Sequence, residues 1–282
     1  MDLIKSHAKL NLFLHVNGKR KDSYHNLDSL IAFCNDLYDE ISIDPINSIQ
    51  DQIEFTGLYS ASIHQDDNLL TKSLEEFFSG ERKQYFSIKI KKNIPVGAGL
   101  GGGSSNAAAL FRYLNNNFTY SGKLRLLNSL NKIGSDVPVC YYDRISYFNK
   151  TGNEIFPSRL SFTPYAVILF PEKLIKTESI FASGFDKYST LEEKKYLFNS
   201  YEEIIKFLHN KNNDLFDNTI KTSPDLKYYL DLMRHTDQCD IARMTGSGSA
   251  IFGLFKTKNK AINAIDQLKK HKSIFLTMSG LR

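Results

Sequence analysis

Hydrophobic and polar positions follow two different periods along this 282-residue chain, which predicts a mixture of strands and helices. In residues 87–94 isoleucine alternates with lysine or other polar residues, as in a strand that buries one face. Residues 165–170 are hydrophobic throughout, which is typical of a strand buried on both faces. In residues 67–79 leucine and phenylalanine recur every three or four positions, so we expect a helix with one buried side.

The remaining elements are predicted from the same two periods and from the glycines and prolines between them. Strands are expected at residues 8–16, 29–33, 40–44, 141–148, 250–255 and 273–278. Helices are expected at residues 106–115, 123–132, 201–209, 225–234 and 260–270. Strands and helices mixed in this order indicate an α+β fold. Residues 151–164 contain two prolines and a glycine, so we expect an N-terminal domain over 1–155 and a C-terminal domain over 156–282.

Composition narrows the class of protein. Hydrophobic residues make up 41% of the chain, which is enough for the cores of two domains. No apolar run is long enough to span a bilayer and residues 1–5 do not open a signal peptide, so we expect a soluble protein of the cytoplasm. The cysteines, Cys34, Cys140 and Cys239, are scattered and indicate neither a disulfide framework nor a zinc site. The net charge of +5 suits polyphosphate ligands.

The glycine-rich segment at residues 95–109 carries the strongest chemical signal. Five glycines fall within the seven positions 97–103, and two serines and an alanine-rich stretch follow. Glycines at this density let backbone N–H groups approach an anion without obstruction by a Cβ atom. Ser104 or Ser105 is expected to cap a helix that begins near Asn106, so the loop would end at the positive end of a helix dipole. The segment therefore predicts a phosphate-binding loop.

Three other interpretations of this segment are weaker. A flexible linker is disfavoured because a strand precedes the loop and a helix follows it. A Walker loop is excluded because no Gly-Lys-Ser/Thr sequence closes it. The dinucleotide-binding pattern is matched by Gly97, Gly99 and Gly102, but no acidic residue ends a second strand about twenty residues later.

The loop closely resembles the phosphate-binding motif of the GHMP kinases, a family named for galactokinase, homoserine kinase, mevalonate kinase and phosphomevalonate kinase. Three further segments, 8–14, 134–138 and 245–250, are similar to other motifs of that family and occur in the same order. The resemblance implies an N-terminal domain similar to the second domain of ribosomal protein S5, a ferredoxin-like C-terminal domain, and a site in the cleft between them. It also implies ATP as phosphoryl donor, with Mg²⁺ bound to the nucleotide.

On the nucleotide side, the resemblance assigns ATP contacts to Pro95, Val96, Gly97, Ala98, Gly99, Leu100, Gly101, Gly102, Gly103, Ser104, Ser105, Asn68 and Lys92. Two of these assignments have simpler alternatives. Asn68 also fits the N-cap of the helix expected at 67–79. Lys92 follows Lys89 and Lys91, which we expect on the solvent face of their strand.

Phosphoryl transfer to an alcohol requires a group that orients or deprotonates the hydroxyl, and Asp136 is our leading candidate. An aspartate after Gly134-Ser135 is more often a cap or turn residue, but the family motif aligned on it favours a catalytic role. Lys9 is the second candidate, because a cation beside the base would stabilise negative charge on the attacking oxygen. Lys9 and Asn11 share one face of their strand. The resemblance implies that Lys9 and Asp136 lie together.

On the acceptor side, the segment with Tyr24 and His25 resembles family members that phosphorylate a cytidylylated sugar alcohol. In those members an aromatic ring stacks on the cytosine, and the neighbouring histidine reads the edge of the base. The resemblance assigns substrate contacts to Asn11, Tyr24, His25, Thr177, Phe181, Gly246 and Ser247. The chain departs from the family pattern at 152–154 and at 171–181, and both departures lie around the substrate.

Two other functions remain open at this point: a kinase of the homoserine or mevalonate type, and a non-catalytic nucleotide- or RNA-binding protein. Tyr24-His25 argues against the first, because those alcohols have no base to stack. Lys9, Asp136 and the complete loop argue against the second. The expected partner is therefore a small-molecule substrate, with no nucleic acid, no membrane and no metal held by the protein alone. The chain is expected to be a monomer or a weak homodimer.

Overall fold

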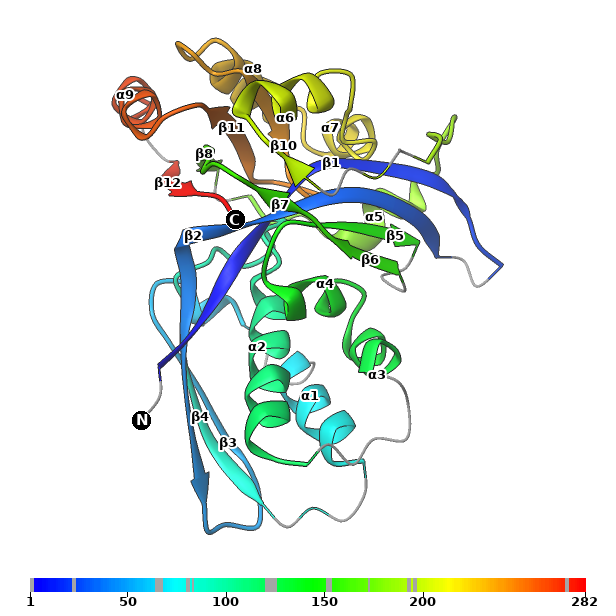
Figure 1. Ribbon diagram of the computed structural model, residues 1–282, viewed down its shortest axis with the longest axis vertical. Helices are drawn as coiled ribbons and strands as arrows, with labels where there is room; N and C mark the ends of the chain where they lie inside the picture. Colours follow the sequence, from blue (N-terminus) through cyan, green and yellow to red (C-terminus); the bar gives the residue numbers. More distant parts are fainter. Residues whose placement is uncertain are drawn as a thin grey trace.

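The computed structural model describes residues 3–282 except 22–23, 64–67, 80–81, 83, 120–125, 151–153, 172, 192–193, 195–196 and 272–273. The described chain forms two main sheets with helices on their outer sides (Figure 1). In the described part of the chain, no helix combines the length and the apolar character that crossing a bilayer demands.

The first sheet is built from the N-terminal half. Its strands are β1 (Leu3–Lys19), β2 (His25–Ile46), β3 (Gln52–Thr56), β4 (Tyr85–Lys91), β5 (Ser146–Lys150) and β6 (Glu154–Pro157). The order is β3-β4-β2-β5-β6, and β1 also pairs with β2. Helices α1 (Leu69–Phe78), α2 (Gly102–Asn117), α3 (Leu126–Ile133) and α4 (Val137–Tyr142) lie together on one side of this sheet (Figure 1). A 3₁₀ turn, η1 (Ser60–Ser62), follows β3.

The second sheet is antiparallel, with the order β10-β11-β8-β12. Its strands are β8 (Tyr165–Phe170), β10 (Ile241–Met244), β11 (Ile251–Phe255) and β12 (Phe275–Gly280). The helices of this half are α5 (Thr177–Ala182), α6 (Tyr201–Leu208), α7 (Phe216–Thr222), α8 (Asp225–Arg234) and α9 (Lys258–Leu268). Two short strands, β7 (Arg159–Leu160) and β9 (Leu197–Phe198), pair in parallel beside it.

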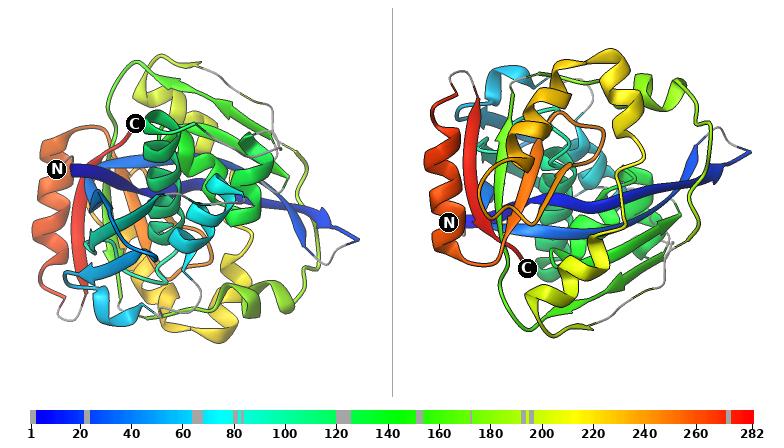
Figure 2. Two further views of the ribbon diagram at one scale, coloured as in Figure 1. Left: turned by 90° about the horizontal axis from the view of Figure 1, so that it is seen from below. Right: turned by 90° about the horizontal axis from the view of Figure 1, so that it is seen from above.

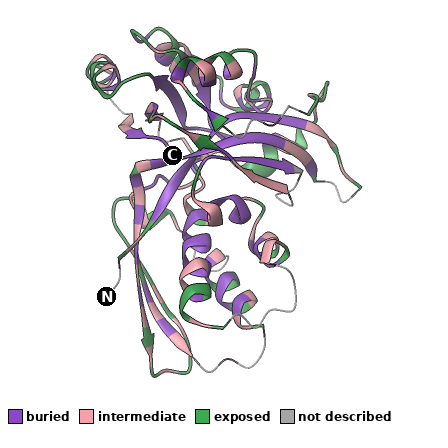
Figure 3. Cartoon of the chain, in the orientation of Figure 1, coloured by how far each residue is buried: buried purple, intermediate pink, exposed green. Residues whose placement is uncertain are grey.

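Side chains alternate between the two faces of each sheet, and this alternation defines the layers. In β2, Ile31 and Phe33 pack with α1 and α2, whereas Leu30 and Ala32 face the second sheet. In β8, alternate residues join that same inner core or an outer core that includes α8 and α9. Both sheets are therefore buried on two faces over much of their area, as Figure 3 shows. This arrangement is the physical reason for the uninterrupted apolar run at 165–170.

The two halves are joined through more than side-chain packing. Leu14 of β1 exchanges backbone hydrogen bonds with Asn212 and Asp214 of the C-terminal half, at 3.0 and 2.8 Å. The backbone of Arg282 also exchanges two hydrogen bonds of 3.0 Å with Phe33 of β2. These contacts tie the first sheet to two separate segments of the C-terminal half, and the two parts share one continuous core.

The structure agrees with the predicted α+β class, and most predicted elements are found with small shifts at their ends. The helix predicted at 225–234 is α8, and the strand predicted at 165–170 is β8. Residue 67, residues 123–125 and residue 273, where three predicted elements begin, lie outside the described residues, as does part of the departure at 152–154. The predicted domain boundary between 155 and 156 falls within β6 and stays a prediction.

Three predictions are wrong in detail. The strands expected at 29–33 and 40–44 are one continuous strand, β2. The strand expected at 141–148 begins only at Ser146, because 137–142 form the short helix α4. The helix expected near Asn106 begins at Gly102, and its N-cap is Gly101 rather than a serine.

Candidate active site

A cavity of about 610 Å³ opens where the glycine-rich loop, β1, the start of α4 and the loop after β10 meet. This volume is in the range typical of small-molecule sites. Most of the predicted site residues line the cavity: Lys9, Asn11, Asn68, Lys92, residues 95–104, Asp136, Thr177, Phe181, Gly246 and Ser247. Tyr24, His25 and Ser105 were also predicted, but they are not part of its wall.

The glycine-rich loop is a left-handed turn that leads directly into α2. Gly97, Gly99 and Gly101 have φ values of 67°, 76° and 67°, a region that favours glycine. Gly101 caps α2 with its backbone alone, since no side chain bonds the first turn. The first N–H groups of an α-helix have no partner within the helix and carry its positive dipole end. The wall of the cavity at 102–104 is therefore suited to bind an anion.

Backbone hydrogen bonds fix the loop to both halves of the protein. The N–H of Lys9 donates to the carbonyl of Leu100 at 2.9 Å, and the N–H of Ala250 donates to the carbonyl of Ala98 at 3.0 Å. The first bond comes from β1. The second comes from residues 245–250, the C-terminal glycine motif. The loop is consequently held in one conformation before any ligand binds.

Close contacts, as well as backbone angles, require glycine at positions 99 and 101 of the loop. A Cβ atom on Gly99 would lie 2.3 Å from the carbonyl oxygen of Thr245. A Cβ atom on Gly246 would in turn lie 3.0 Å from the carbonyl oxygen of Gly99. A Cβ atom on Gly101 would lie 2.6 Å from Cγ of Lys9. The two glycine motifs thus pack against each other, which the sequence patterns did not reveal.

Lys9 and Asp136 meet in the cavity, as the resemblance implied. The ammonium Nζ of Lys9 lies 3.0 Å from Oδ2 of Asp136 and donates to Oδ1 of Asn11 at 2.7 Å. Lys9 is 4% exposed, whereas the side chain of Asp136 is 33% exposed and can contact a ligand. Asp136 occupies the N-cap of α4 but makes no capping hydrogen bond, so its carboxylate is available to the cavity.

A second layer of hydrogen bonds orients Asn11. Its Nδ2 donates to the hydroxyl of Ser29 at 2.9 Å, and its backbone N–H donates to Oγ1 of Thr245 at 2.9 Å. The Ser29 hydroxyl donates in turn to the carbonyl of Phe13. Sequence analysis missed Ser29 and Thr245 as parts of the site. Thr245 begins the C-terminal glycine motif and could have been noticed there, whereas Ser29 gave no signal.

Lys92 lies beneath the start of α2 and already has a partner. Its ammonium pairs with the carboxylate of Asp39, and both side chains are almost fully buried. The same carboxylate accepts the N–H groups of Asn93 and Ile94 at 2.8 and 2.9 Å. Nζ of Lys92 is only 3.3 Å from the position that a Cβ of Gly102 would occupy. Lys92 therefore forms a compensated ion pair below the loop, with Asp39, which sequence analysis missed.

The other lysines of this strand and Asn68 behave as their simpler interpretations predicted. Lys89 and Lys91 are more than half exposed and pair with carboxylates on the sheet surface. Oδ1 of Asn68 accepts the N–H of Leu70 at 3.0 Å, which makes Asn68 the N-cap of α1. Asn68 still lines the cavity, so capping does not remove it from the site.

Around His25 and Phe181, which the resemblance assigned to the substrate, aromatic rings form a compact cluster. His25 stacks on Phe181 with ring centroids 5.2 Å apart and an interplanar angle of 28°, and the edge of Phe185 meets it at 5.1 Å. Burial, with a smaller contribution from nearby Lys19, lowers the pKa of His25. Close by, Oγ1 of Thr177 and Oγ of Ser247 share a hydrogen bond of 2.8 Å.

Tyr24 is 68% exposed, at the end of the hairpin that links β1 and β2. This hairpin projects from the body of the molecule in both views of Figure 2. The carbonyl of Tyr24 accepts the N–H of Arg20 at 2.7 Å, which closes the described part of the turn.

The first N–H groups of α2 give the site the chemistry to bind an organic polyanion. Among the residues that the structure describes, no group of three histidine, cysteine or acidic side chains is placed to hold a metal ion. A hydrated Mg²⁺ on a nucleotide needs fewer protein ligands, because phosphate oxygens supply the others. The carboxylate of Asp136 and the hydroxyl of Ser104, both in the cavity wall, are oxygen ligands of the kind that Mg²⁺ prefers.

Comparisons with known proteins agree with this geometry. A model of the GHMP kinases N terminal domain matches residues 68–144, and a model of the GHMP kinases C terminal domain matches residues 191–274. A 4-diphosphocytidyl-2-C-methyl-D-erythritol kinase from Anaplasma marginale (strain Florida) is 34% identical over 275 residues, covering 94% of this chain and 92% of that protein. The kinase of the same name from Ehrlichia canis (strain Jake) is 32% identical, covering 95% and 94%.

Solved structures show the same relationship at the level of the fold. A crystal structure of 4-(cytidine 5'-diphospho)-2C-methyl-D-erythritol kinase superposes with a TM-score of 0.76 at 26% identity, covering 99% of both chains. A crystal structure of mevalonate kinase superposes with a TM-score of 0.60 at 15% identity, covering 100% of both chains, and shows likeness of fold alone.

Proposed function

Because this chain belongs to the GHMP kinase family, we propose that it transfers the γ-phosphoryl group of ATP to the 2-hydroxyl of 4-diphosphocytidyl-2-C-methyl-D-erythritol. This is a step in the non-mevalonate synthesis of isoprenoid precursors. The observation that carries the proposal is the Lys9–Asp136 pair, 3.0 Å apart, beside a helix N-terminus built to bind phosphate. The relatives that share about a third of this sequence carry the name of that kinase.

The glycine-rich loop binds the triphosphate of ATP in this proposal. The N–H groups at 102–104 donate to phosphate oxygens, and the dipole of the 16-residue helix α2 favours the negative charge. The buried ion pair of Lys92 and Asp39 supports the start of α2 from below. The hydrogen bonds from Lys9 and Ala250 hold the loop rigid, so little ordering is required when the nucleotide binds.

Mg²⁺ accompanies the nucleotide, and Asp136 and Ser104 are the residues that would hold it. When bound, the ion neutralises charge on the phosphates and on the transferring group. The chain's own residues supply the binding and the orientation of the two substrates.

Asp136 acts on the acceptor. Its carboxylate orients the attacking hydroxyl and accepts its proton as the new P–O bond forms and the bond from the γ-phosphorus to ADP breaks. Lys9 stabilises the negative charge that develops on the attacking oxygen. Asn11 fixes Lys9 through the 2.7 Å hydrogen bond, so the ammonium stays directed at the reacting atoms.

The acceptor binds on the α5 side of the cavity. Phe181 provides an aromatic face for the cytosine, and Thr177 and Ser247 provide hydroxyl groups for the sugar and diphosphate. His25 buttresses the ring of Phe181 and can read an edge of the base. Tyr24, at the tip of the neighbouring hairpin, covers the base from outside when substrate is bound.

A product assay tests this function. In three parallel reactions, the protein is incubated with MgATP and one alcohol: the cytidylylated alcohol, mevalonate or homoserine. The phosphorylated product is identified by mass spectrometry. We expect product from the cytidylylated alcohol alone, and none from the Asp136→Asn variant on the same time scale. Turnover of mevalonate or homoserine at a comparable rate would refute the substrate assignment, and absence of any product would refute the activity.

A further inference from the structure

The short helix that carries Asp136 is held at its far end by charged side chains. α4 ends at Asp143, which has a left-handed backbone with φ of 51°. The guanidinium of Arg112, from α2, donates to the carbonyl of Tyr141 at 2.7 Å and to that of Cys140 at 3.4 Å. These carbonyls belong to the last turn of α4, where helix carbonyls lack partners within the helix. Arg112 therefore caps the helix from outside.

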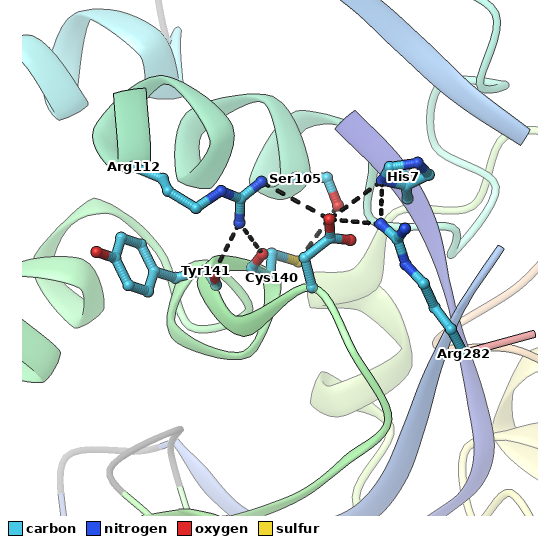
Figure 4. Close-up of polar contacts among 7 residues, drawn as sticks. His7, Ser105, Arg112, Cys140, Tyr141 and Arg282 are labelled. Carbon is cyan, nitrogen blue, oxygen red and sulfur yellow. Dashed lines mark hydrogen bonds and ion pairs between the residues drawn. The ribbon is translucent and has the colours of Figure 1, made fainter. Parts of the chain in front are cut away.

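The carboxylate of Asp143 contacts the side chains of His7, Arg112 and Arg282. Its Oδ2 lies 2.6 Å from Nη2 of Arg282, 3.2 Å from Nδ1 of His7 and 3.7 Å from Nη2 of Arg112. Nη2 of Arg282 also contacts Nδ1 of His7 at 2.6 Å. Figure 4 shows His7, Arg112 and Arg282 converging from three different elements. Burial raises the pKa of Asp143, but the contacts with His7 and Arg282 outweigh it, so the carboxyl has a lowered pKa and is ionised.

One strand contacts both ends of α4. Lys9 of β1 pairs with Asp136 at the N-terminal end of the helix, and His7, two residues earlier in β1, contacts Asp143 at the C-terminal end. A β-bulge in the pairing of β1 with β2 lies between His7 and Lys9. The position of Asp136 relative to Lys9 is thus set by a helix of only six residues that is fixed to the same strand at its other end.

We propose that Asp143 is a positioning residue for phosphoryl transfer: its ion pairs fix α4 and thereby hold the Asp136 carboxylate at the correct distance from Lys9 and the attacking hydroxyl. The inference rests on the proposed function. Asp143 itself is not in the wall of the cavity, so it acts through Asp136 and not on the substrate. Arg112 and Arg282 contact the end of α4 from two sides. Together they fix the orientation of the helix, which a single hydrogen bond could not do.

Asp143→Gly is the informative variant. Glycine adopts a left-handed backbone without strain, so the change removes the carboxylate and leaves the turn intact. We expect kcat to fall roughly 10- to 100-fold, because a displacement of about 1 Å at a reacting group costs that much. The KM for ATP is expected to stay within about twofold, since Lys9 and Ala250 hold the loop through their backbones. Asp143→Asn keeps an acceptor for Arg282, and we expect it to restore part of the lost turnover.

Two comparisons separate positioning from a general loss of structure. Asp51 is a matched control, because it is similarly buried and pairs with Arg82 far from the cavity. Asp51→Asn is expected to lower the melting temperature and leave kcat unchanged. In a protein that already carries Asp136→Asn, Asp143→Gly is expected to cause no further fall in kcat, because the carboxylate that it positions is gone.

Hydrogen exchange measured by mass spectrometry provides a readout that does not depend on activity. We expect the amides of residues 137–143 to exchange faster in Asp143→Gly than in the unmodified protein, with exchange in β4 unchanged. The inference is overturned if Asp143→Gly keeps kcat within twofold, if it lowers kcat equally in the Asp136→Asn background, or if α4 exchange is unaltered. If the unmodified protein phosphorylates none of the tested alcohols, the proposed function fails, and the exchange of α4 alone decides whether Asp143 fixes the helix.

Discussion

Substituting Gly101 with alanine should damage the catalytic pair without changing either Lys9 or Asp136. Gly101 has φ of 67°, where a residue with a Cβ costs about 1–2 kcal/mol. The added methyl would lie 2.6 Å from Cγ and 2.9 Å from Cε of Lys9, well inside contact distance. Lys9 is 4% exposed and its ammonium is bound to Asp136 and Asn11, so it can yield only by weakening a charged hydrogen bond. Such a bond contributes about 1.5–3 kcal/mol.

These two effects together predict a loss of roughly 2.5–5 kcal/mol in the free energy of unfolding. For a chain of this size the melting temperature should fall by several degrees, roughly 2–4 °C per kcal/mol. Displacement of Lys9 should also lower kcat at least about tenfold. Thermal unfolding can be followed by circular dichroism, and kcat by the product assay.

Gly103→Ala is the matched control. Gly103 lies in the first turn of α2 with an ordinary helical backbone, and its added Cβ would meet only Leu69, at 3.9 Å. Alanine in a helix is more stable than glycine by roughly 0.5–1 kcal/mol, so this variant should be at least as stable as the parent. Because Gly103 lines the phosphate site, the two variants are compared in stability alone. If Gly101→Ala matched Gly103→Ala in stability, the contact between the loop and Lys9 would have no energetic importance.

Four further predictions follow from the site. Asp136→Asn should lower kcat by roughly 10²–10⁴-fold with little change in the dissociation constant of ATP measured by calorimetry; near-normal turnover would make Asp136 a cap residue only. Asp39→Asn should lower the stability measured by urea unfolding by about 3–5 kcal/mol, because it leaves the buried ammonium of Lys92 uncompensated; a loss below about 1 kcal/mol would contradict this. Phe181→Ala should raise the KM for the cytidylylated alcohol by the equivalent of about 1–3 kcal/mol, whereas the KM for ATP should not change. The pKa of His25 is lowered in the folded state, so the unfolded state binds a proton at this residue more readily. The free energy of unfolding should therefore decrease as the pH falls through and below about 6.5. In His25→Gln this decrease should be absent.

The elements that sequence patterns predicted well are those in which packing and local preference agree. Residues 165–170 are apolar because β8 lies between two cores, and residues 225–234 are amphipathic because α8 covers one face of the second sheet. The patterns failed where a polar residue is buried with a distant partner. β2 was divided in two because Asn35, Asp36 and Asp39 interrupt its apolar pattern. Nothing local indicates that Lys92 compensates the charge of Asp39.

The individual motifs of the site could be predicted from the sequence, but the contacts between them could not. The glycine-rich loop is visible in the sequence because its chemistry is local. Lys9 and Asp136 were paired through family resemblance, since only the long-range contact of β1 with α4 brings them to 3.0 Å. α4 itself was missed because six residues are too few to show a helical period. The predicted cap serines failed because a left-handed glycine can end a loop by backbone geometry alone.

Lys9 serves the site twice, since its backbone N–H holds the loop at Leu100 and its side chain reaches Asp136. In the proposed mechanism, donor binding and acceptor activation therefore share one residue, so a change at Lys9 that affects the first should also disturb the second. Attempts to change which alcohol is phosphorylated should leave this strand intact. The useful positions are around Thr177 and Phe181, which line the cavity and contact Ser247 and His25.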